Sequence, residues 1–181
     1  MNHRVAVTGL GMITPFGIGV QAMWEGVRSG RVTVGPLTRF DASAFPSRIA
    51  AQIDDFDPSA FMSKRRVQWT DRFSQLAVCA AHLAIADAGF EFSIPKSEMG
   101  AFAGSALGGV ALAEEQMHVF AGQGLRAVRP LLTISVFGGA AASNIAIEFG
   151  ITGPSTSNGN SCAAGAMAIG DAFRAVRRGE I

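Results

Sequence analysis

The stretch STSNGNSCAAGAMAIGDAFRAVRRG (residues 155–179) predicts a helix that begins at Cys162. Apolar residues recur from this cysteine at steps of four, three, four and three positions, which places them on one face of a helix. These positions are Cys162, Ala166, Ile169, Phe173 and Val176. Arginines crowd the last turn and Gly179 follows, as is typical of a helix C-terminus. The cysteine therefore stands at the N-terminal end of the predicted helix.

A thiol in this position is a candidate nucleophile. Free backbone N–H groups and the positive end of the helix dipole favour the thiolate, which is the form that attacks carbonyl carbons. Gly159 and residues 163–165 are small, so a substrate carbonyl can approach closely and accept hydrogen bonds from backbone N–H groups. From position alone, a small hydrophobic thiol packed in the core remains the alternative for Cys162. Cys79 lies among alanines of another predicted helix, and packing is its expected role.

Two other motifs suggest different chemistry, and both are weak. GNSCA (159–163) nearly matches the G-x-S-x-G elbow of serine hydrolases, which would make Ser161 the nucleophile. Its last position is alanine, and no histidine follows it to complete a triad. VTGLGMITPFG (7–17) suggests a dinucleotide-binding loop, but it lacks the G-x-G-x-x-G spacing and contains a proline.

Composition indicates one globular α/β domain. The chain has 181 residues, of which 49% are apolar and 16% charged, with 22 glycines for tight turns. A net charge of +1 gives no indication of nucleic-acid or membrane-surface binding. No apolar run reaches the roughly 18–20 residues that a membrane span needs. Short apolar runs bounded by turn residues predict strands at 5–7, 48–53 and within 99–109. Apolar spacing, small residues and helix-ending glycines predict helices at 20–29, about 70–89, 110–121 and 138–146.

The cysteines and histidines are scattered, so their spacing predicts no metal site. The spacing leaves a disulfide open, but a reduced, cytoplasmic protein is the default expectation. A signal peptide is the alternative for residues 2–22, where glycines and a proline interrupt the apolar stretch as turn residues would.

Several segments, taken in order, resemble those of the elongating β-ketoacyl-[acyl-carrier-protein] synthases, the condensing enzymes of fatty-acid and polyketide synthesis. They are RVAVTGLGMITPFG (4–17), TDRFSQLAVCAAHLAIADAGF (70–90), GSALGG (104–109) and FGITGPS…SCAAGAMAIGDA (149–172). The resemblance implies that residues 1–181 form the N-terminal half of a thiolase-like fold, a five-stranded mixed sheet with covering helices. It also implies that two catalytic histidines lie beyond Ile181. Residues 1–181 alone are therefore expected to be inactive and to expose apolar surface.

The resemblance implies a role for Cys162 as the acyl acceptor in a decarboxylative Claisen condensation with malonyl-carrier protein, its N–H helping to form the oxyanion hole. Leu107 falls where the family lines its acyl pocket, with an ordinary core leucine as the alternative. Leu131 and Ile134 match a segment that in the family reaches the partner subunit's pocket. Ile134 and Gly139 stand where the family often has proline and asparagine, and GNSC replaces a more usual threonine-alanine-cysteine.

The implied partners are an acyl carrier protein and a second synthase subunit, identical or related. Lys64, Arg65 and Arg66 match the region that docks the acidic carrier protein, with a solvated turn as the alternative. No cofactor is implied apart from the phosphopantetheine of the carrier. A different class of function also stays open, a non-catalytic partner that only binds, although such partners usually lack the cysteine found here at position 162.

Overall fold

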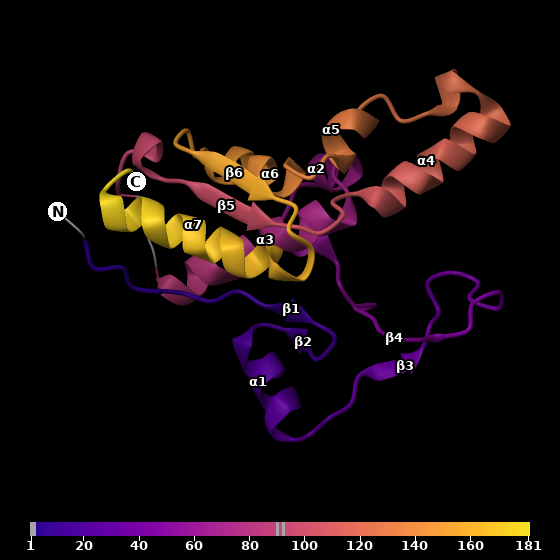
Figure 1. Ribbon diagram of the computed structural model, residues 1–181, viewed down its shortest axis with the longest axis horizontal. Coiled ribbons are helices and arrows are strands. Elements are labelled where there is room, and N and C mark those ends of the chain that lie inside the picture. The colour runs from indigo at the N-terminus through magenta and orange to yellow at the C-terminus, as the bar shows by residue number, and fades with distance from the viewer. Residues whose placement is uncertain (1–2, 90, 92) are drawn as a thin grey trace.

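The computed structural model describes residues 3–89, 91 and 93–181, and its centre is a pair of parallel strands (Figure 1). They are β5 (Ala101–Gly104) and β6 (Ser155–Asn158), paired with Ala101 opposite Ser155 and Gly104 opposite Asn158. Side chains alternate across the strands, so Ala101 packs with alanines of α6 (Ala140–Phe149) while Gly104 meets α7 (Ala164–Arg178) on the other face. The strand pair is therefore enclosed between two helices.

The third main helix, α3 (Arg72–Ala88), packs against α6 and has the ends that its sequence predicts. Asp71 caps it by accepting a hydrogen bond from the Phe73 N–H at 2.9 Å, and Gly89 ends it in the left-handed conformation. Val78 and Cys79 of this helix form a core cluster with Phe56 and Met62. The predicted packing role of Cys79 is confirmed, because its side chain is fully buried.

The other elements surround this centre, with α4 and α5 at one end and α1, β3 and β4 on another side (Figure 1). The helices are α1 (Val20–Arg28), α2 (Lys64–Trp69), α4 (Val110–Gln123) and α5 (Leu132–Val136). Short 3-10 turns are η1 (Pro58–Ala60), η2 (Lys96–Glu98), η3 (Leu125–Ala127) and η4 (Ser161–Ala163). Two antiparallel pairs complete the set, β1 (Ile13–Thr14) with β2 (Gly17–Ile18) and β3 (Val34–Pro36) with β4 (Ile49–Ala51).

The predicted five-stranded sheet is not formed within the described part of the chain, where strands pair only two by two. The predicted buried strand at residues 5–7 was also wrong, because the segment pairs with no described strand and Val7 is exposed. The adjoining residues lie against helix α3 instead. The Leu10 N–H donates to the Asp87 carboxylate at 2.8 Å, and a Cβ atom at Gly11 would come within 1.9 Å of the Ala80 carbonyl oxygen. These residues are therefore bound through α3, and not through a ladder with a described strand.

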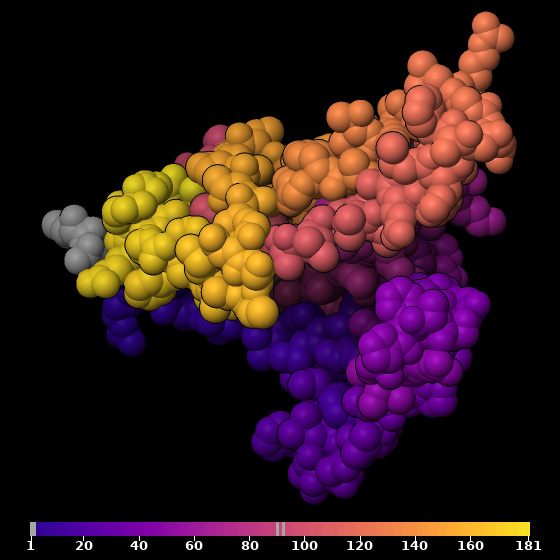
Figure 2. Space-filling view, turned by 45° about the vertical axis from the view of Figure 1, so that its right-hand side comes forward, coloured from indigo at the N-terminus to yellow at the C-terminus, as the bar shows by residue number. Residues whose placement is uncertain are grey.

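Helix α7, which is part of the yellow region in Figure 2, presents small residues to the strands and larger apolar ones to the surface. Ala164, Ala168 and Ala175 are buried, whereas Ile169 and Phe173 are 71% and 43% exposed. Close packing against β5 leaves room only for small side chains, so the larger ones point away. The expected exposure of apolar surface is confirmed. Among the described residues, no helix has the length and apolar character required to cross a membrane.

Candidate active site

Cys162 lies in the turn that connects strand β6 to helix α7. After Asn158 the chain passes through Gly159 and Asn160 into η4, which contains Cys162 and leads directly into α7. The thiol is exposed and forms no disulfide with Cys79. Ser161 has φ +49°, the only positive φ of a non-glycine residue in the described part of the chain. The strained position is therefore Ser161, one residue before Cys162, in the turn that exposes the thiol.

The turn after β5 lies beside the turn that carries Cys162. The Ser105 N–H donates to the Asn158 carbonyl oxygen at 3.1 Å, and the Gly108 N–H donates to Ser105 Oγ at 2.9 Å. Parallel strands end at the same sheet edge, so this pairing brings the Leu107 and Cys162 turns together. Leu107 is 74% exposed, so it is not part of the core formed by the described residues.

Cys79 is a poor alternative nucleophile. Burial raises the pKa of the Cys79 thiol to about 11, and the negative charge of Glu148 acts in the same direction. A thiol with this pKa is almost entirely protonated near neutral pH, and its sulfur is inaccessible to solvent. Cys162 is therefore the accessible thiol of the two.

Leu131 and Ile134 lie at α5, away from the Cys162 turn. Both line an apolar pocket of about 460 Å³, together with Trp69, Phe137 and Ile147. Leu131 and Trp69 also line an adjoining pocket of about 630 Å³ that includes Arg129 and Pro130. Cys162 is not among the described residues that line either pocket. These two residues therefore share neither pocket with the thiol of the same chain.

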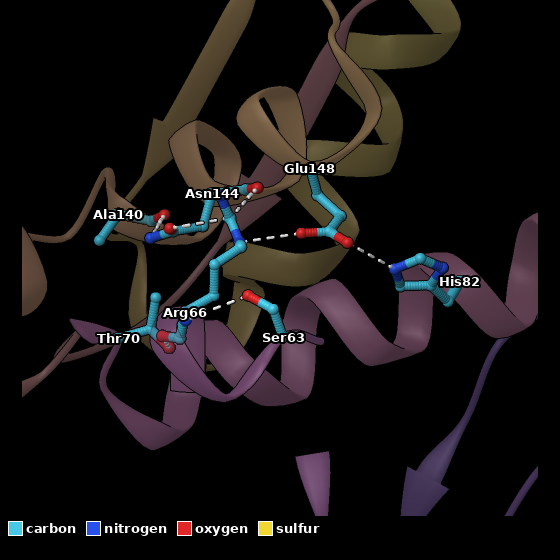
Figure 3. A network of polar contacts seen from close by, with 7 residues as sticks. All are labelled: Ser63, Arg66, Thr70, His82, Ala140, Asn144 and Glu148. Atoms are coloured by element: carbon cyan, nitrogen blue, oxygen red, sulfur yellow. Dashed lines mark hydrogen bonds and ion pairs between the residues drawn. The ribbon is translucent and has the colours of Figure 1, made fainter. Parts of the chain in front are cut away.

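The basic triplet at the start of α2 is divided between two environments. Lys64 and Arg65 are exposed, and the Arg65 guanidinium lies 4.1 Å from the centre of the Trp69 ring. Arg66 turns inward: its Nε lies 2.9 Å from Glu148 Oε2, and its Nη2 donates to the Asn144 carbonyl oxygen at 3.0 Å (Figure 3). Arg66 is thus engaged by α6, whereas its two neighbours face solvent.

Glu148 extends this network to α3. Its Oε1 lies 3.1 Å from His82 Nε2, so one carboxylate connects helices α2, α3 and α6 (Figure 3). The side chains of Arg66 and Glu148 are only 24% and 16% exposed, which strengthens the ion pair relative to a surface pair. The contacts of Glu148 and Asn144 with Arg66 could not be predicted from the sequence, because only the four-residue spacing of the two residues indicated that they share a helix face.

The three histidines lie on other elements. His3 packs beside Gly179, His82 contacts Glu148, and His118 belongs to α4. Within the residues that the structure describes, no three His, Cys, Asp or Glu side chains are grouped so as to hold a metal ion. The candidate site therefore consists of the Cys162 thiol, the N-terminal end of α7 and the Leu107 turn.

Comparison with known proteins gives consistent matches along the whole chain. The 3-oxoacyl-[acyl-carrier-protein] synthase 2 of Synechocystis sp. is 38% identical over 179 residues, covering 98% of this chain and 43% of that protein. The enzyme of the same name from Coxiella burnetii is 34% identical over 176 residues, covering 97% and 42%. The chain thus spans less than half the length of these relatives.

A solved structure entitled "The ishigamide ketosynthase/chain length factor" superposes with a TM-score of 0.86 at 28% identity, covering 100% of this chain and 46% of that chain. This similarity confirms the predicted thiolase-like α/β fold. The family model described as "Beta-ketoacyl synthase, N-terminal domain" matches residues 2–181. Because this family model matches nearly the whole chain and agrees with the fold, the chain belongs to the beta-ketoacyl synthase family.

Proposed function

We propose that the full-length protein is a 3-oxoacyl-[acyl-carrier-protein] synthase of fatty-acid or polyketide synthesis and that Cys162 carries its acyl group. The observation that carries this proposal is the exposed thiol on a strained turn immediately before α7. The relatives named 3-oxoacyl-[acyl-carrier-protein] synthase 2 support the reaction class. The acyl and malonyl substrates would arrive on the phosphopantetheine of a carrier protein, and no other cofactor is proposed.

The first half-reaction is a thioester exchange. The Cys162 Sγ attacks the carbonyl carbon of the acyl-carrier thioester, a new C–S bond forms, and the bond to the pantetheine sulfur breaks. The carrier leaves as a thiolate, which takes up a proton. Backbone N–H groups at the start of a helix have no intrahelical partners, so the Cys162 N–H is suited to stabilise the oxyanion.

The second half-reaction forms the carbon–carbon bond. Malonyl-carrier protein loses carbon dioxide, the resulting carbanion attacks the carbonyl carbon of the Cys162 thioester, and the sulfur leaves. Groups that stabilise the enolate are needed, and the three histidines described here lie on other elements. We expect histidines outside residues 1–181 to supply them.

The acyl chain would lie near the Leu107 turn, whose Ser105 N–H is hydrogen-bonded to Asn158, four residues before the thiol. Leu131 and Ile134 are proposed to reach the acyl pocket of a second subunit, identical or related. Their exposure at α5, in a pocket that Cys162 of the same chain does not line, supports a role in a neighbouring site. The cytoplasm is the proposed location of the enzyme.

Carrier-protein docking is proposed for Lys64 and Arg65, which are exposed beside Trp69. Clustered positive charge speeds the encounter with an acidic partner, and salt weakens the effect. Arg66 is proposed to have a structural role and not to contact the carrier protein, because its ion pair with Glu148 connects α2 to α6.

Charge reversal tests the docking proposal. The double variant Lys64→Glu/Arg65→Glu in the full-length protein is expected to raise KM for carrier-bound substrate about tenfold at low salt, while KM for a small thioester analogue stays unchanged. Reversal of Arg4 and Arg28, two exposed arginines, makes the same change in net charge and serves as the control. Arg66→Met is expected to lower the unfolding free energy by about 1–2 kcal/mol instead. Equal losses with both substrates would assign Lys64 and Arg65 to the fold.

Mass spectrometry tests the proposed function directly. Incubation of the full-length protein with acyl-carrier protein is expected to add one acyl mass to the peptide that contains Cys162. Subsequent malonyl-carrier protein should remove the adduct and yield a 3-oxoacyl product. An adduct on Ser161, which is an ester and resists neutral hydroxylamine, would contradict the assignment. Carrier binding without any adduct would support the non-catalytic alternative.

A further inference from the structure

We propose that Asn158 is a positioning residue for Cys162, holding the turn that presents the thiol. This inference rests on the proposed role of Cys162 as acyl acceptor. Asn158 is the last residue of β6 and lies four residues before the cysteine. Its side chain is half-buried beneath the turn.

The amide of Asn158 bonds to the chain on both sides of Cys162. Its Oδ1 accepts hydrogen bonds from the Asn160 N–H at 3.3 Å and from Asn160 Nδ2 at 3.1 Å. Its Nδ2 donates to the Ala164 carbonyl oxygen at 3.1 Å. Asn160 and Ala164 each lie two residues from Cys162, so one side chain connects both ends of the segment whose central residue is the cysteine.

The base of this connection is fixed to the strand pair. The Asn158 carbonyl oxygen accepts from the Ser105 N–H at 3.1 Å, and Asn158 pairs with Gly104 across the β5–β6 ladder. Gly104 in turn contacts the backbone of Ala164. The segment 160–164 is therefore attached to the end of β6 through the amide and supported from β5.

The strained backbone of the turn explains why such a connection is needed. A non-glycine residue with positive φ costs about 1 kcal/mol or more and persists only where its surroundings hold it. Ser161, with φ +49°, lies inside the segment that Asn158 connects. Without the amide, the turn can relax and carry the adjacent thiol away from its attacking position.

The contacts require both a donor and an acceptor on the side chain at position 158. Asparagine offers both, whereas aspartate offers only acceptors and leucine, with nearly the same shape, offers neither. Asn158→Asp keeps the bonds from Asn160 and loses the bond to Ala164. Asn158→Leu loses all three. The two variants thus remove one and all three, respectively, of the hydrogen bonds that the Asn158 side chain makes.

The test uses Asn158→Leu and Asn158→Asp in the full-length protein. We expect Asn158→Leu to lower kcat and the rate constant for Cys162 acylation about tenfold or more, with KM changed less than about twofold, because substrate contacts remain. Asn158→Asp is expected to recover part of the rate. Gln52→Leu removes a comparable amide connection between β3 and β4, through Thr38 and Pro36, and should leave the rate unchanged.

Alkylation of Cys162 by iodoacetamide separates this inference from the proposed function. If the native enzyme forms no acyl adduct at Cys162, the proposed function fails, and the alkylation rate still tests the connection. A native alkylation rate and native kcat in Asn158→Leu would overturn the inference. If that variant does not fold, the same result in Asn158→Asp would overturn it, as would loss of rate explained entirely by a raised KM.

Discussion

Replacement of Cys162 by alanine is expected to lower carbon–carbon bond formation at least about 10³-fold, because it removes the atom that holds the acyl group between the two half-reactions. The small change in volume at an exposed position should leave the melting temperature nearly unchanged. The measurements are product formation from acyl- and malonyl-carrier protein, and the acyl adduct detected by intact mass.

Two matched variants make this result specific. Ser161→Ala removes the competing hydroxyl of the same turn, and it should retain the acyl adduct on Cys162. Cys79→Ala removes the other thiol of residues 1–181, which is buried and has its pKa raised to about 11, and it should reduce stability without loss of acylation. Brief iodoacetamide treatment should modify Cys162 first. Acyl transfer that survives in Cys162→Ala and disappears in Ser161→Ala would move the nucleophile to Ser161.

The sequence was sufficient to predict those helices whose ends and apolar faces are determined by neighbouring residues. Helix α3 could be predicted with its ends, because Asp71 and Gly89 act within one turn of the helix that they bound. The helix after the cysteine followed from the same kind of evidence, namely the apolar spacing and the stop at Gly179, but α7 begins at Ala164 and Cys162 itself lies in the preceding 3-10 turn. Caps and periodicity depend on neighbouring residues alone, so they need no knowledge of the rest of the fold.

The sequence was insufficient where the outcome depends on distant partners. The residues 5–7 have the composition of a strand, but a strand forms only beside another strand, and the adjoining chain lies on α3. Arg66 reads as one of three equal basic residues until Glu148, 82 positions away, is placed beside it. The apolar stripe of α7 was found correctly, yet its orientation depends on how closely β5 approaches the helix.

That close approach occurs at Gly104, where β5 ends beneath the first turn of α7. A Cβ atom at position 104 would lie 2.1 Å from the Ala164 carbonyl oxygen and 2.7 Å from the Gly165 nitrogen. Both are backbone atoms, so no side-chain rotation can relieve the overlap. Helix α7 would have to move away from the strand and carry the preceding Cys162 turn with it.

Gly104→Ala is therefore expected to lower the unfolding free energy of the full-length protein by about 1–3 kcal/mol. It should also slow acylation of Cys162 by about 10²-fold, because displacement of a reacting group by about 1 Å has an effect of this size. Urea denaturation and the rate of acyl-adduct formation measure the two effects. Gly122→Ala is the matched control, because a Cβ atom there meets no atom within 4 Å on the exposed side of α4. That control should keep the native acylation rate and gain about 0.5–1 kcal/mol from improved helix propensity. Native stability and native acylation in Gly104→Ala would show that α7 can move from β5 without disturbing Cys162.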